Sequence, residues 1–401
     1  MDRRKNPYTP NAGAPPPALA GREEQLETFD ILLDRLLDGY TEQSMLISGL
    51  RGVGKTVLLG EFRRVAEEKH WTTVETEFAK DISFGPRMVR LAREALLDLA
   101  PPARWKERGR RAAAVLSSFS LKVEPDGSLT TGLDVEPATG VADSGDLDRD
   151  LTDLFVALGE AAREQGSGVV FLLDEMQDLQ QQELAAIVAA VHKTVQRVLP
   201  LTVVGAGLPQ LPRLAVEAKS YAERLFRFPE IGRLDPSAAE TALVQPATAL
   251  RVDYTADAVE FIVDYTEGYP YFVQLYGQLI WNTAQVSPIT LQDARDVRHL
   301  VERALDESFF RVRTDRTTET ELAYLRAMAE LGAKPQRAGD VAKRMNRTVE
   351  QMGTTRARLI SKGLLYTPGH GFAGFTVPQF DRYLKRSFPL HVPTPRTRPG
   401  K

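Results

Sequence analysis

The stretch Gly49-Leu50-Arg51-Gly52-Val53-Gly54-Lys55-Thr56 has the residue types and spacing of a phosphate-binding loop. Its glycines allow backbone amides to converge on a phosphate, and a helix that starts in the loop adds partial positive charge. We expect Lys55 to reach the β- and γ-phosphates of ATP and Thr56 to ligate Mg²⁺. The sequence therefore predicts a Walker A loop that binds ATP through Gly49, Gly52, Val53, Gly54, Lys55, Thr56 and Val57.

A second chemical signal is the run Val169-Val170-Phe171-Leu172-Leu173-Asp174-Glu175. An apolar strand that ends in two carboxylates predicts a Walker B element, with Asp174 in the Mg²⁺ shell and Glu175 polarising the attacking water. Carboxylates at a strand end can also be solvated turn residues, but the phosphate-binding loop upstream favours a catalytic role for this pair. Small-molecule kinases and GTPases normally lack the second carboxylate. The pair therefore indicates an ATPase that does mechanical or switching work.

Elements that could position these motifs alternate along the chain. Strand patterns are expected at 44–47, 72–77, 169–173 and 201–205, and helical patterns at 23–37, 57–68, 85–99, 148–165 and 181–198. We also take Phe228 to Ile231 as a fifth strand. This order predicts an α/β P-loop NTPase core over 21–235, with a parallel sheet covered by helices on both faces.

One segment interrupts the alternation. Apolar residues alternate on both sides of Pro125-Asp126-Gly127, which predicts a β-hairpin inserted at about 118–136. The hairpin would cover an edge of the sheet, or alternatively contact DNA or another subunit.

The remaining segments differ from the core in composition. Residues 1–20 are rich in proline and predict a flexible arm. Helical patterns over 236–310 predict a helical lid. Three helices and a two-stranded wing over 319–388 predict a winged helix-turn-helix, and a basic tail follows at 389–401.

Composition narrows the function classes. The chain has no cysteine and only five histidines, so thiol chemistry and Cys-held metal clusters are excluded, and Mg²⁺ carried by a nucleotide is the metal to expect. No apolar run is long enough to cross a bilayer, and no signal-peptide core follows the start, so we expect a cytoplasmic protein without membrane contact. The overall charge is −3, yet beyond residue 320 fifteen basic residues face five acidic ones. This excess predicts a polyanionic partner.

With these motifs the sequence resembles the AAA+ superfamily, especially its origin-recognition, transposition-type and STAND-like branches, over about residues 19–310. Leu19-Ala20-Gly21-Arg22-Glu23 looks like the box whose backbone lies near adenine, which implies contacts from Gly21 and Arg22. Gly268-Tyr269-Pro270 looks like the lid motif whose proline packs on the base, which implies a role for Pro270. Arg224 stands where related ATPases place an arginine finger, and the family assembles into oligomers when ATP binds.

The resemblance fails at one position. The run Leu201 to Leu208 has glycine where a polar residue usually ends the strand and helps to position water. We therefore expect slow turnover, as in a switch rather than a processive motor.

The C-terminal unit offers a candidate DNA-reading helix. Gln351, Thr355, Arg358 and Lys362 recur at spacings of four, three and four, so they share one helix face, and Arg344 and Arg347 precede it. In a helix-turn-helix this face enters the major groove. The sequence thus favours an ATP-dependent, DNA-associated switch. Two alternatives stay open: a STAND-like regulatory ATPase whose winged helix binds protein, and a nucleotide-binding scaffold that barely hydrolyses ATP.

Overall fold

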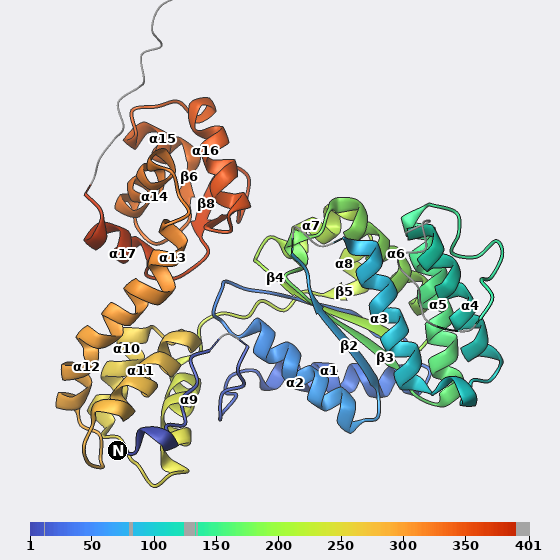
Figure 1. Cartoon of the computed structure of the whole chain (residues 1–401). Helices are drawn as coiled ribbons and strands as arrows, with labels where there is room; N and C mark the ends of the chain where they lie inside the picture. The colour runs from blue at the N-terminus through green and yellow to red at the C-terminus, as the bar shows by residue number, and fades with distance from the viewer. Residues whose placement is uncertain (12, 80–82, 124–132, 134, 390–401) are drawn as a thin grey trace, which may run out of the picture. The chain divides into compact units, whose positions relative to one another are not determined.

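The computed structural model describes residues 1–11, 13–79, 83–123, 133 and 135–389. The chain divides into two compact units, coloured by chain position in Figure 1. The core unit contains residues 22–49 and 54–231, and the C-terminal unit contains residues 1–21, 50–53 and those from 232 onward. Each unit is described by itself below.

A five-stranded parallel sheet in the order β2-β3-β4-β1-β5 organises the core unit. Its strands are β1 Ser44–Ser48, β2 Thr72–Glu77, β3 Val169–Asp174, β4 Leu201–Gly207 and β5 Phe226–Arg227. Every residue of β1, β3 and β4 is buried, which is why these strands are almost continuously apolar. The predicted α/β class with a parallel sheet is confirmed.

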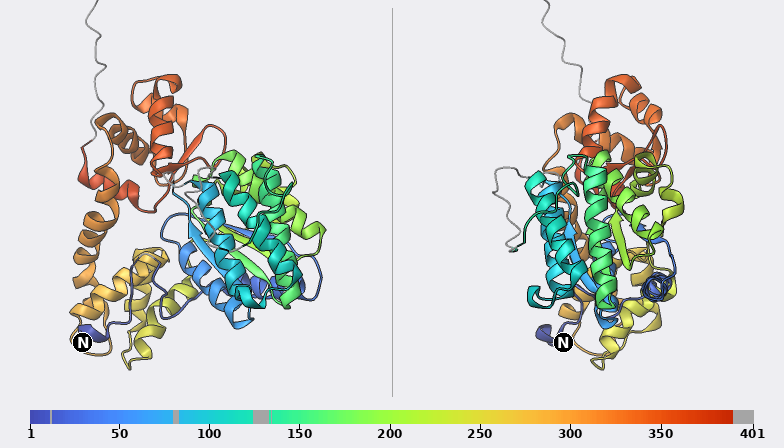
Figure 2. Two further views of the ribbon diagram at one scale, coloured as in Figure 1. Left: turned by 45° about the vertical axis from the view of Figure 1, so that its right-hand side comes forward. Right: turned by 90° about the vertical axis from the view of Figure 1, so that its right-hand side faces the viewer.

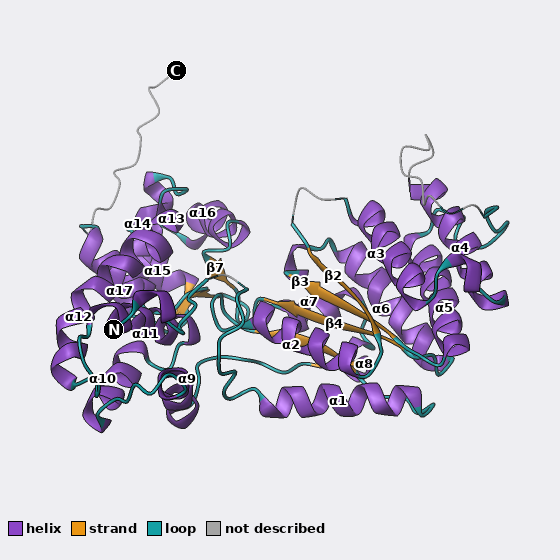
Figure 3. Cartoon of the chain, turned by 60° about the horizontal axis from the view of Figure 1, so that its bottom comes forward, coloured by secondary structure: helices purple, strands orange, loops and turns teal. Residues whose placement is uncertain are grey.

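Helices cover the sheet and connect its strands. They are α1 Glu23–Leu37, α2 Lys55–Glu68, α3 Phe84–Leu99, α4 Glu107–Val123, α5 Leu147–Gln165, α6 Gln181–Gln196, α7 Leu211–Ala218 and α8 Ala222–Leu225. In Figures 1 and 3, α1 and α2 lie on one side of the strands, and α3, α5 and α6 lie on the other. Local signals fix several ends, because Asp146 caps α5 at its start and Gly166 ends it in a left-handed conformation.

The predicted hairpin at about 118–136 is wrong in its first half. Residues 118–123 belong to α4, where Ala112, Leu116 and Phe119 form a buried stripe at helical spacing. The alternating pattern favours a strand, but the buried stripe of α4 packs against α3 and α5 in one hydrophobic core. The stability gained by this packing decides for the helix. The second half of the predicted hairpin lies almost entirely outside the described residues.

The fifth strand is shorter and begins earlier than predicted. It is β5, which ends at Arg227, and Glu230 makes only an isolated bridge to Ser48.

The C-terminal unit contains helices over the residues predicted to form a lid, and we call this bundle the lid below. Its helices are α9 Pro236–Thr248, α10 Ala256–Thr266, α11 Pro270–Thr283 and α12 Leu291–Ala304, and α12 continues through a π-helical turn, η4 Leu305–Phe310, into α13 Arg311–Thr314. No helix among the described residues is both long and apolar enough to span a membrane.

Part of the N-terminal segment packs on this lid, in contrast to the flexible arm that we expected. It contains one short 3₁₀ turn, η1 Arg3–Lys5. The Met1 amine donates to Ala284 O at 2.9 Å, and the hydroxyl of Tyr8 donates to Leu243 O at 2.5 Å. Tyr8 is buried, and Gly277 makes room for it, because a Cβ there would lie 2.5 Å from the Tyr8 ring. The segment is thus anchored to the lid through its first eight residues.

A small domain follows the lid in the same unit. Its helices are α14 Glu319–Leu331, α15 Ala338–Arg344, α16 Val349–Ser361 and α17 Phe380–Ser387, and its antiparallel sheet has the order β6-β8-β7, with β6 Gln336–Arg337, β7 Leu365–Tyr366 and β8 Phe372–Phe375. This arrangement is compatible with the predicted winged helix. Figure 2 shows the domain beyond the lid helices in two further views.

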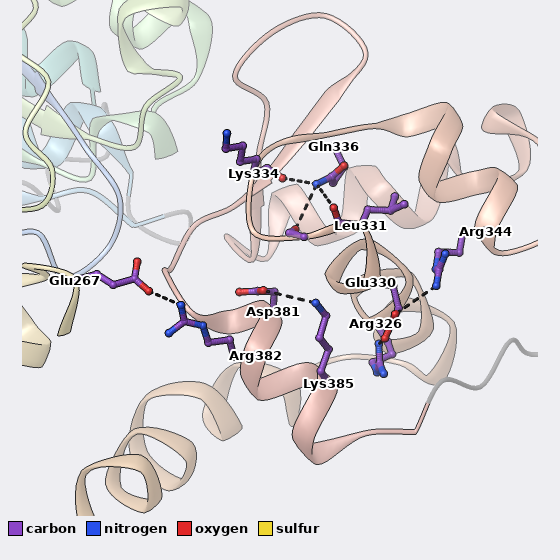
Figure 4. Close-up of polar contacts among 11 residues, drawn as sticks. Glu267, Arg326, Glu330, Leu331, Lys334, Gln336, Arg344, Asp381, Arg382 and Lys385 are labelled. Carbon is purple, nitrogen blue, oxygen red and sulfur yellow. Dashed lines mark hydrogen bonds and ion pairs between the residues drawn. The ribbon is translucent and has the colours of Figure 1, made fainter. Parts of the chain in front are cut away.

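Polar and aromatic contacts join α17 to the lid. Arg382 pairs with Glu267 at 2.8 Å, as Figure 4 shows, and Gln379 Nε2 donates to Tyr265 O at 3.0 Å. The rings of Phe310 and Tyr383 stack with centroids 5.1 Å apart. The small domain is therefore packed onto the end of the lid rather than tethered by a free linker.

Candidate functional site: a phosphate loop and paired carboxylates

The phosphate loop lies between the carboxyl end of β1 and the start of α2. Gly49 N donates to Gly207 O at 3.1 Å, which ties the start of the loop to the end of β4. Gly54 has φ 92°, a left-handed conformation that L side chains rarely adopt, and α2 begins immediately after it. The first amides of α2 therefore lie at the loop, where an anion is stabilised by the helix terminus.

Lys55 is held inside this loop. Its side chain is almost fully buried, and Nζ donates to Gly49 O at 3.0 Å, so the ammonium group is folded back across the loop. A buried ammonium ion is costly unless it has strong partners. Phosphate oxygens are stronger partners for this cation than a single carbonyl, because the hydrogen bonds become charge-assisted.

Thr56, in the first turn of α2, meets Asp174 at the end of β3. The Thr56 hydroxyl donates to Asp174 Oδ2 at 2.6 Å, and Glu175 N donates to Asp174 Oδ1 at 2.8 Å. Burial raises the pKa of Asp174 above its usual value, although the bonds from Thr56 and Glu175 N act in the opposite direction. Glu175 has φ 53°, and strain of this kind in a non-glycine residue is typical of functional sites.

The oxygen atoms of Thr56 and Asp174 fit a magnesium ion. A hydroxyl and a carboxylate are the hard oxygen ligands that Mg²⁺ prefers, and two protein ligands suffice when phosphates and waters supply the rest. Among the described residues no group of three or more His, Asp or Glu side chains could hold a metal by itself. Thr56 and Asp174 thus suit an ion whose other ligands are phosphate oxygens and waters.

Gln177 is a residue that the sequence analysis missed. It lies in the 3₁₀ turn η3 Met176–Asp178, where Nε2 donates to Glu175 Oε2 and Oε1 accepts from Leu208 N at 2.9 Å. One side chain thus links the candidate catalytic glutamate to the end of β4. Gly207 makes room for it, because a Cβ there would lie 2.7 Å from Gln177 Oε1. The sequence signals were the amide two positions after Glu175 and the glycine at 207.

Other predicted nucleotide contacts are placed as follows. Arg22 is buried beside the start of α1, and burial lowers the pKa of its guanidinium. Val57 lies in the first turn of α2. In the C-terminal unit, Gly21 has φ 69° and Pro270 opens α11.

The loop tip, residues 50–53, belongs to the C-terminal unit. A Cβ on Gly52 would lie 3.1 Å from the ring of Tyr269, and Arg51 N donates to Thr376 O at 3.1 Å. Gly52 itself has φ 80°. The Gly268-Tyr269-Pro270 segment therefore lies next to the loop tip within this unit.

Arg224 lies at the amino end of the strands, beside the edge strand β5. It is exposed in α8, directly before β5, and Phe226 of β5 pairs with Ser44 at the amino end of β1. Because the phosphate loop follows the carboxyl end of β1, the length of the strand separates Arg224 from its own loop. The neighbouring Arg227 pairs with Glu42 at 3.1 Å.

The six candidate DNA contacts divide into two groups. Gln351 and Arg358 are exposed and Thr355 is half-buried on one face of α16, and Arg347 lies in the preceding turn. Lys362 and Arg344 form ion pairs with acidic side chains. Lys362 Nζ lies 2.6 Å from the buried Glu321 carboxylate, and Arg344 lies 3.3 Å from Glu330, as Figure 4 shows.

Comparison with known proteins gives a family match over the phosphate loop and both carboxylates. A model of the "AAA ATPase domain" family matches residues 18–204. The predicted resemblance to AAA+ P-loop ATPases is thereby confirmed, and the matched AAA domain contains the loop and both carboxylates. A second model, for a domain of unknown function, matches residues 307–384. No curated protein matches the chain.

The chain is also similar to solved structures. A Walker-type ATPase of Pyrococcus abyssi is similar at 14% identity and a TM-score of 0.52, over 92% of this chain and 96% of that chain. Orc1 of Aeropyrum pernix, solved in complex with DNA, has 13% identity, a TM-score of 0.46, and coverage of 96% and 97%. The Holliday junction branch migration motor RuvB of Thermotoga maritima has 15% identity, a TM-score of 0.44, and coverage of 92% and 96%.

Proposed function

We propose that the AAA domain binds and hydrolyses ATP with Mg²⁺ and that this cycle switches the affinity of the chain for DNA in the cytoplasm. The observation that carries the ATPase part is the hydrogen bond from Thr56, beside the phosphate loop, to Asp174, the residue directly before Glu175. Thr56 lies in the first turn of α2, after β1 and the loop, whereas Asp174 ends β3; β1 and β3 are far apart in the sequence but neighbour β4 on either side.

Each residue has a role in this proposal. Lys55 would exchange its bond to Gly49 O for the phosphates, and Thr56 and Asp174 would hold Mg²⁺, which would neutralise phosphate charge. Glu175 accepts a proton from the attacking water or orients it. Gln177 is a positioning residue, because its amide fixes the carboxylate of Glu175 relative to β4.

Arg224 completes the site of a neighbouring subunit in this proposal. It lies at the amino end of the strands, whereas the phosphate loop lies at their carboxyl end, so it does not serve its own loop. An exposed guanidinium there can stabilise charge on the phosphoryl group of a partner's ATP, an effect of about 10³ to 10⁵ in rate for arginine fingers. ATP binding would then favour oligomer assembly.

The DNA part rests on charge and on the exposed face of α16. Arg358 and Gln351 are exposed there, and the segment beyond residue 320 has a large basic excess. The ion pair between Lys362 and Glu321 and the pair between Arg344 and Glu330 favour the second candidate, a regulatory ATPase whose small domain binds protein. Those pairs remove two cations from a phosphate-binding surface.

Salt dependence separates the two candidates. Fluorescence anisotropy of a labelled duplex is measured with full-length Glu175→Gln protein and ATP, from 50 to about 300 mM salt. We expect affinity to fall steeply with salt, since each phosphate contact contributes about −0.9 to the slope of log K against log salt. Arg358→Ala should weaken binding and reduce the slope by about one. Arg303→Ala, an exposed arginine on α12, is the matched control.

Two results would decide against DNA. Absence of binding at 50 mM salt, or equal effects of Arg358→Ala and Arg303→Ala, would favour the protein-binding alternative. If the wild-type protein turns over ATP no faster than the Lys55→Ala variant, the result would instead favour the scaffold that barely hydrolyses ATP.

A further inference from the structure

A dense run of basic side chains at the start of α4 has no role in the proposed ATP site. The segment 101–123 has six basic residues and one acidic residue, whereas the first 320 residues as a whole have 36 basic and 49 acidic ones. Most of the six lie in residues 104–111, which cover the end of the 3₁₀ turn η2 Pro102–Arg104 and the first turns of α4. In Figures 1 and 3, α4 lies on the outer side of the helical layer, beside α5. The run is thus part of the surface of the core unit.

Four cations of this run are exposed, and their side chains make no hydrogen bond or ion pair with any residue that the structure describes: Arg104, Lys106, Arg110 and Arg111. Exposed arginines on other helices of the core unit behave differently. On α7, for example, Arg213 pairs with Glu217 one turn later, at 2.6 Å. The four cations are therefore available to a partner outside the chain.

The neighbouring carboxylates do not neutralise this surface. Glu160 of α5, whose side chain is largely buried, lies between Arg108 at 2.8 Å and Arg197 at 3.1 Å, so one carboxylate serves two guanidinium groups. Glu164 accepts from Arg108 N at 3.3 Å, and Glu107 is the acidic residue of the run itself. The run and these neighbours together contain six basic and three acidic residues, which leaves a net charge of +3.

A buried tryptophan holds the run in place. Trp105 is buried between two exposed cations, and its Nε1 donates to Ala100 O at 2.7 Å. Gly109 makes room for it, because a Cβ there would lie 3.2 Å from the Trp105 side chain. Arg110 N donates to Lys106 O at 3.1 Å, so these two residues are one helical turn apart, about 6 Å along the axis. The cations therefore project from an ordered backbone, which lowers the entropy cost of binding.

The stability of α4 does not explain these cations. The start of a helix has partial positive charge, and basic side chains in its first turn are unfavourable there. Lys106 and Arg110 also repel each other, since like charges four residues apart on a helix are destabilising. A bound polyanion would relieve both effects.

The surroundings of the run indicate which polyanion it fits. Between residues 101 and 120, all of which the structure describes, no large apolar side chain is exposed. Protein interfaces usually have an apolar or aromatic centre, and helices that bind membranes need an exposed apolar face. A phosphate backbone needs only regularly placed cations, and guanidinium groups match phosphate oxygens in a bidentate manner. These features favour nucleic acid.

We infer that the start of α4 is a second contact surface for the phosphate backbone of duplex DNA. This inference rests on the proposed DNA function and adds a surface of the core unit to the face of α16. Contacts of this kind position a protein on the duplex and do not read its sequence.

The surface is at the opposite end of the sheet from the ATP site. Arg197 ends α6 shortly before β4 begins, and Glu160 lies near the end of α5, which leads into β3. Both connections reach the amino ends of their strands, whereas the phosphate loop and Asp174 follow carboxyl ends. Substitutions at the start of α4 can therefore be tested without changing a residue of the ATP site.

The test measures anisotropy of a labelled duplex with the full-length Glu175→Gln protein and ATP at increasing salt. Adding Lys106→Gln together with Arg110→Gln should lower the slope of log K against log salt by about two and weaken binding about tenfold or more at 50 mM salt, since each phosphate contact contributes about 0.9 to the slope. The matched control is Arg149→Gln together with Arg213→Gln, which removes the same charge from exposed positions of α5 and α7. It should leave the affinity within twofold.

A second measurement separates binding from folding. The Lys106→Gln, Arg110→Gln protein should have an unchanged or higher melting temperature, because it loses two unfavourable cations at the start of a helix. Its affinity for ATP in calorimetry should stay within twofold. A lower melting temperature with unchanged DNA affinity would give these cations a structural role and overturn the inference.

The pattern of losses distinguishes this inference from the proposed α16 interface. If Arg358→Ala weakens DNA binding and the Lys106→Gln, Arg110→Gln protein does not, the inference is wrong and the α16 interface stands. The reverse pattern supports the inference and contradicts the α16 interface. Absence of DNA binding at 50 mM salt overturns both surfaces, and ATP turnover is measured separately. A polyglutamate peptide that competes as well as unlabelled duplex would indicate an acidic protein partner and also overturn the inference.

Discussion

Gln177 allows a direct test of how the candidate catalytic glutamate is held. In Gln177→Glu the side chain keeps its length and an oxygen that can accept from Leu208 N, but it cannot donate to Glu175 and it brings a like charge beside it. A hydrogen bond to a charged group contributes about 1.5 to 3 kcal/mol. Because 1.36 kcal/mol corresponds to a tenfold change in rate, loss of this bond in the transition state should lower kcat about 10- to 150-fold.

The assay separates positioning from binding. Phosphate release gives kcat and KM, and titration calorimetry gives the affinity for ATP. We expect KM and ATP affinity to stay within twofold, because Gln177 bonds to Glu175 and β4 and to no residue of the phosphate loop. Gln177→Leu should show the same loss of kcat and also a lower melting temperature, since it leaves the Leu208 amide without its partner at a cost of about 1 to 3 kcal/mol.

A matched control tests specificity. Gln182→Glu introduces the same change on the exposed start of α6, and it should leave kcat and the melting temperature unchanged. The reasoning is refuted if Gln177→Glu retains kcat within twofold of the wild type. It is equally refuted if the loss appears in KM with kcat intact, because Gln177 would then contribute to binding rather than to positioning.

Three further predictions concern the other charged groups. Lys55→Ala should abolish ATP binding in calorimetry, whereas Glu175→Gln should bind ATP and fail to hydrolyse it; equal loss of affinity would contradict their roles. Arg224→Ala should keep ATP affinity and lose turnover, and mixing it with Lys55→Ala subunits should restore some activity; a dead mixture would make Arg224 an ordinary surface residue. Burial acts to raise the pKa of Glu321, but its bonds with Lys362 and Thr318 outweigh this and hold that pKa below its ordinary value of 4.5. The carboxylate therefore stabilises the fold above that pH and loses its effect as the pH falls through the lower folded pKa, so Glu321→Gln should flatten the fall of melting temperature between pH 5 and about 3.

Much of the core fold could be predicted because its signals are local. The strands β1, β3 and β4 are buried throughout, so their continuous apolar runs mark them without knowledge of their partners. The predictions failed where packing decides. The segment at 119–123 has an alternating pattern, yet it completes the buried stripe of α4. The two-residue strand β5 is too short for any periodicity to reveal it.

The candidate site shows the same division. Lys55, Thr56, Asp174 and Glu175 could be predicted because a loop motif and a strand end identify them within a few residues of sequence. The partner of Lys362 could not, because Glu321 lies 41 residues away and the bond depends on how α14 packs against α16. The face of α16 that was predicted from spacing alone to read DNA thus contains Lys362, which already pairs with Glu321.

The end of β4 is where sequence and structure lead to different conclusions about turnover. Glycine at the end of this strand suggests that no polar group helps to position water. The structure supplies a reason for the glycines: a Cβ on Gly205 would lie 2.0 Å from Met176 Sδ, and one on Gly207 would lie 2.7 Å from Gln177 Oε1. The turn after β3 therefore packs directly on β4 and brings an amide to the place where a polar strand residue was expected. If Gln177 performs that role, the missing residue is no argument for slow hydrolysis, and the kcat of Gln177→Glu relative to the wild type measures how much of the role it performs.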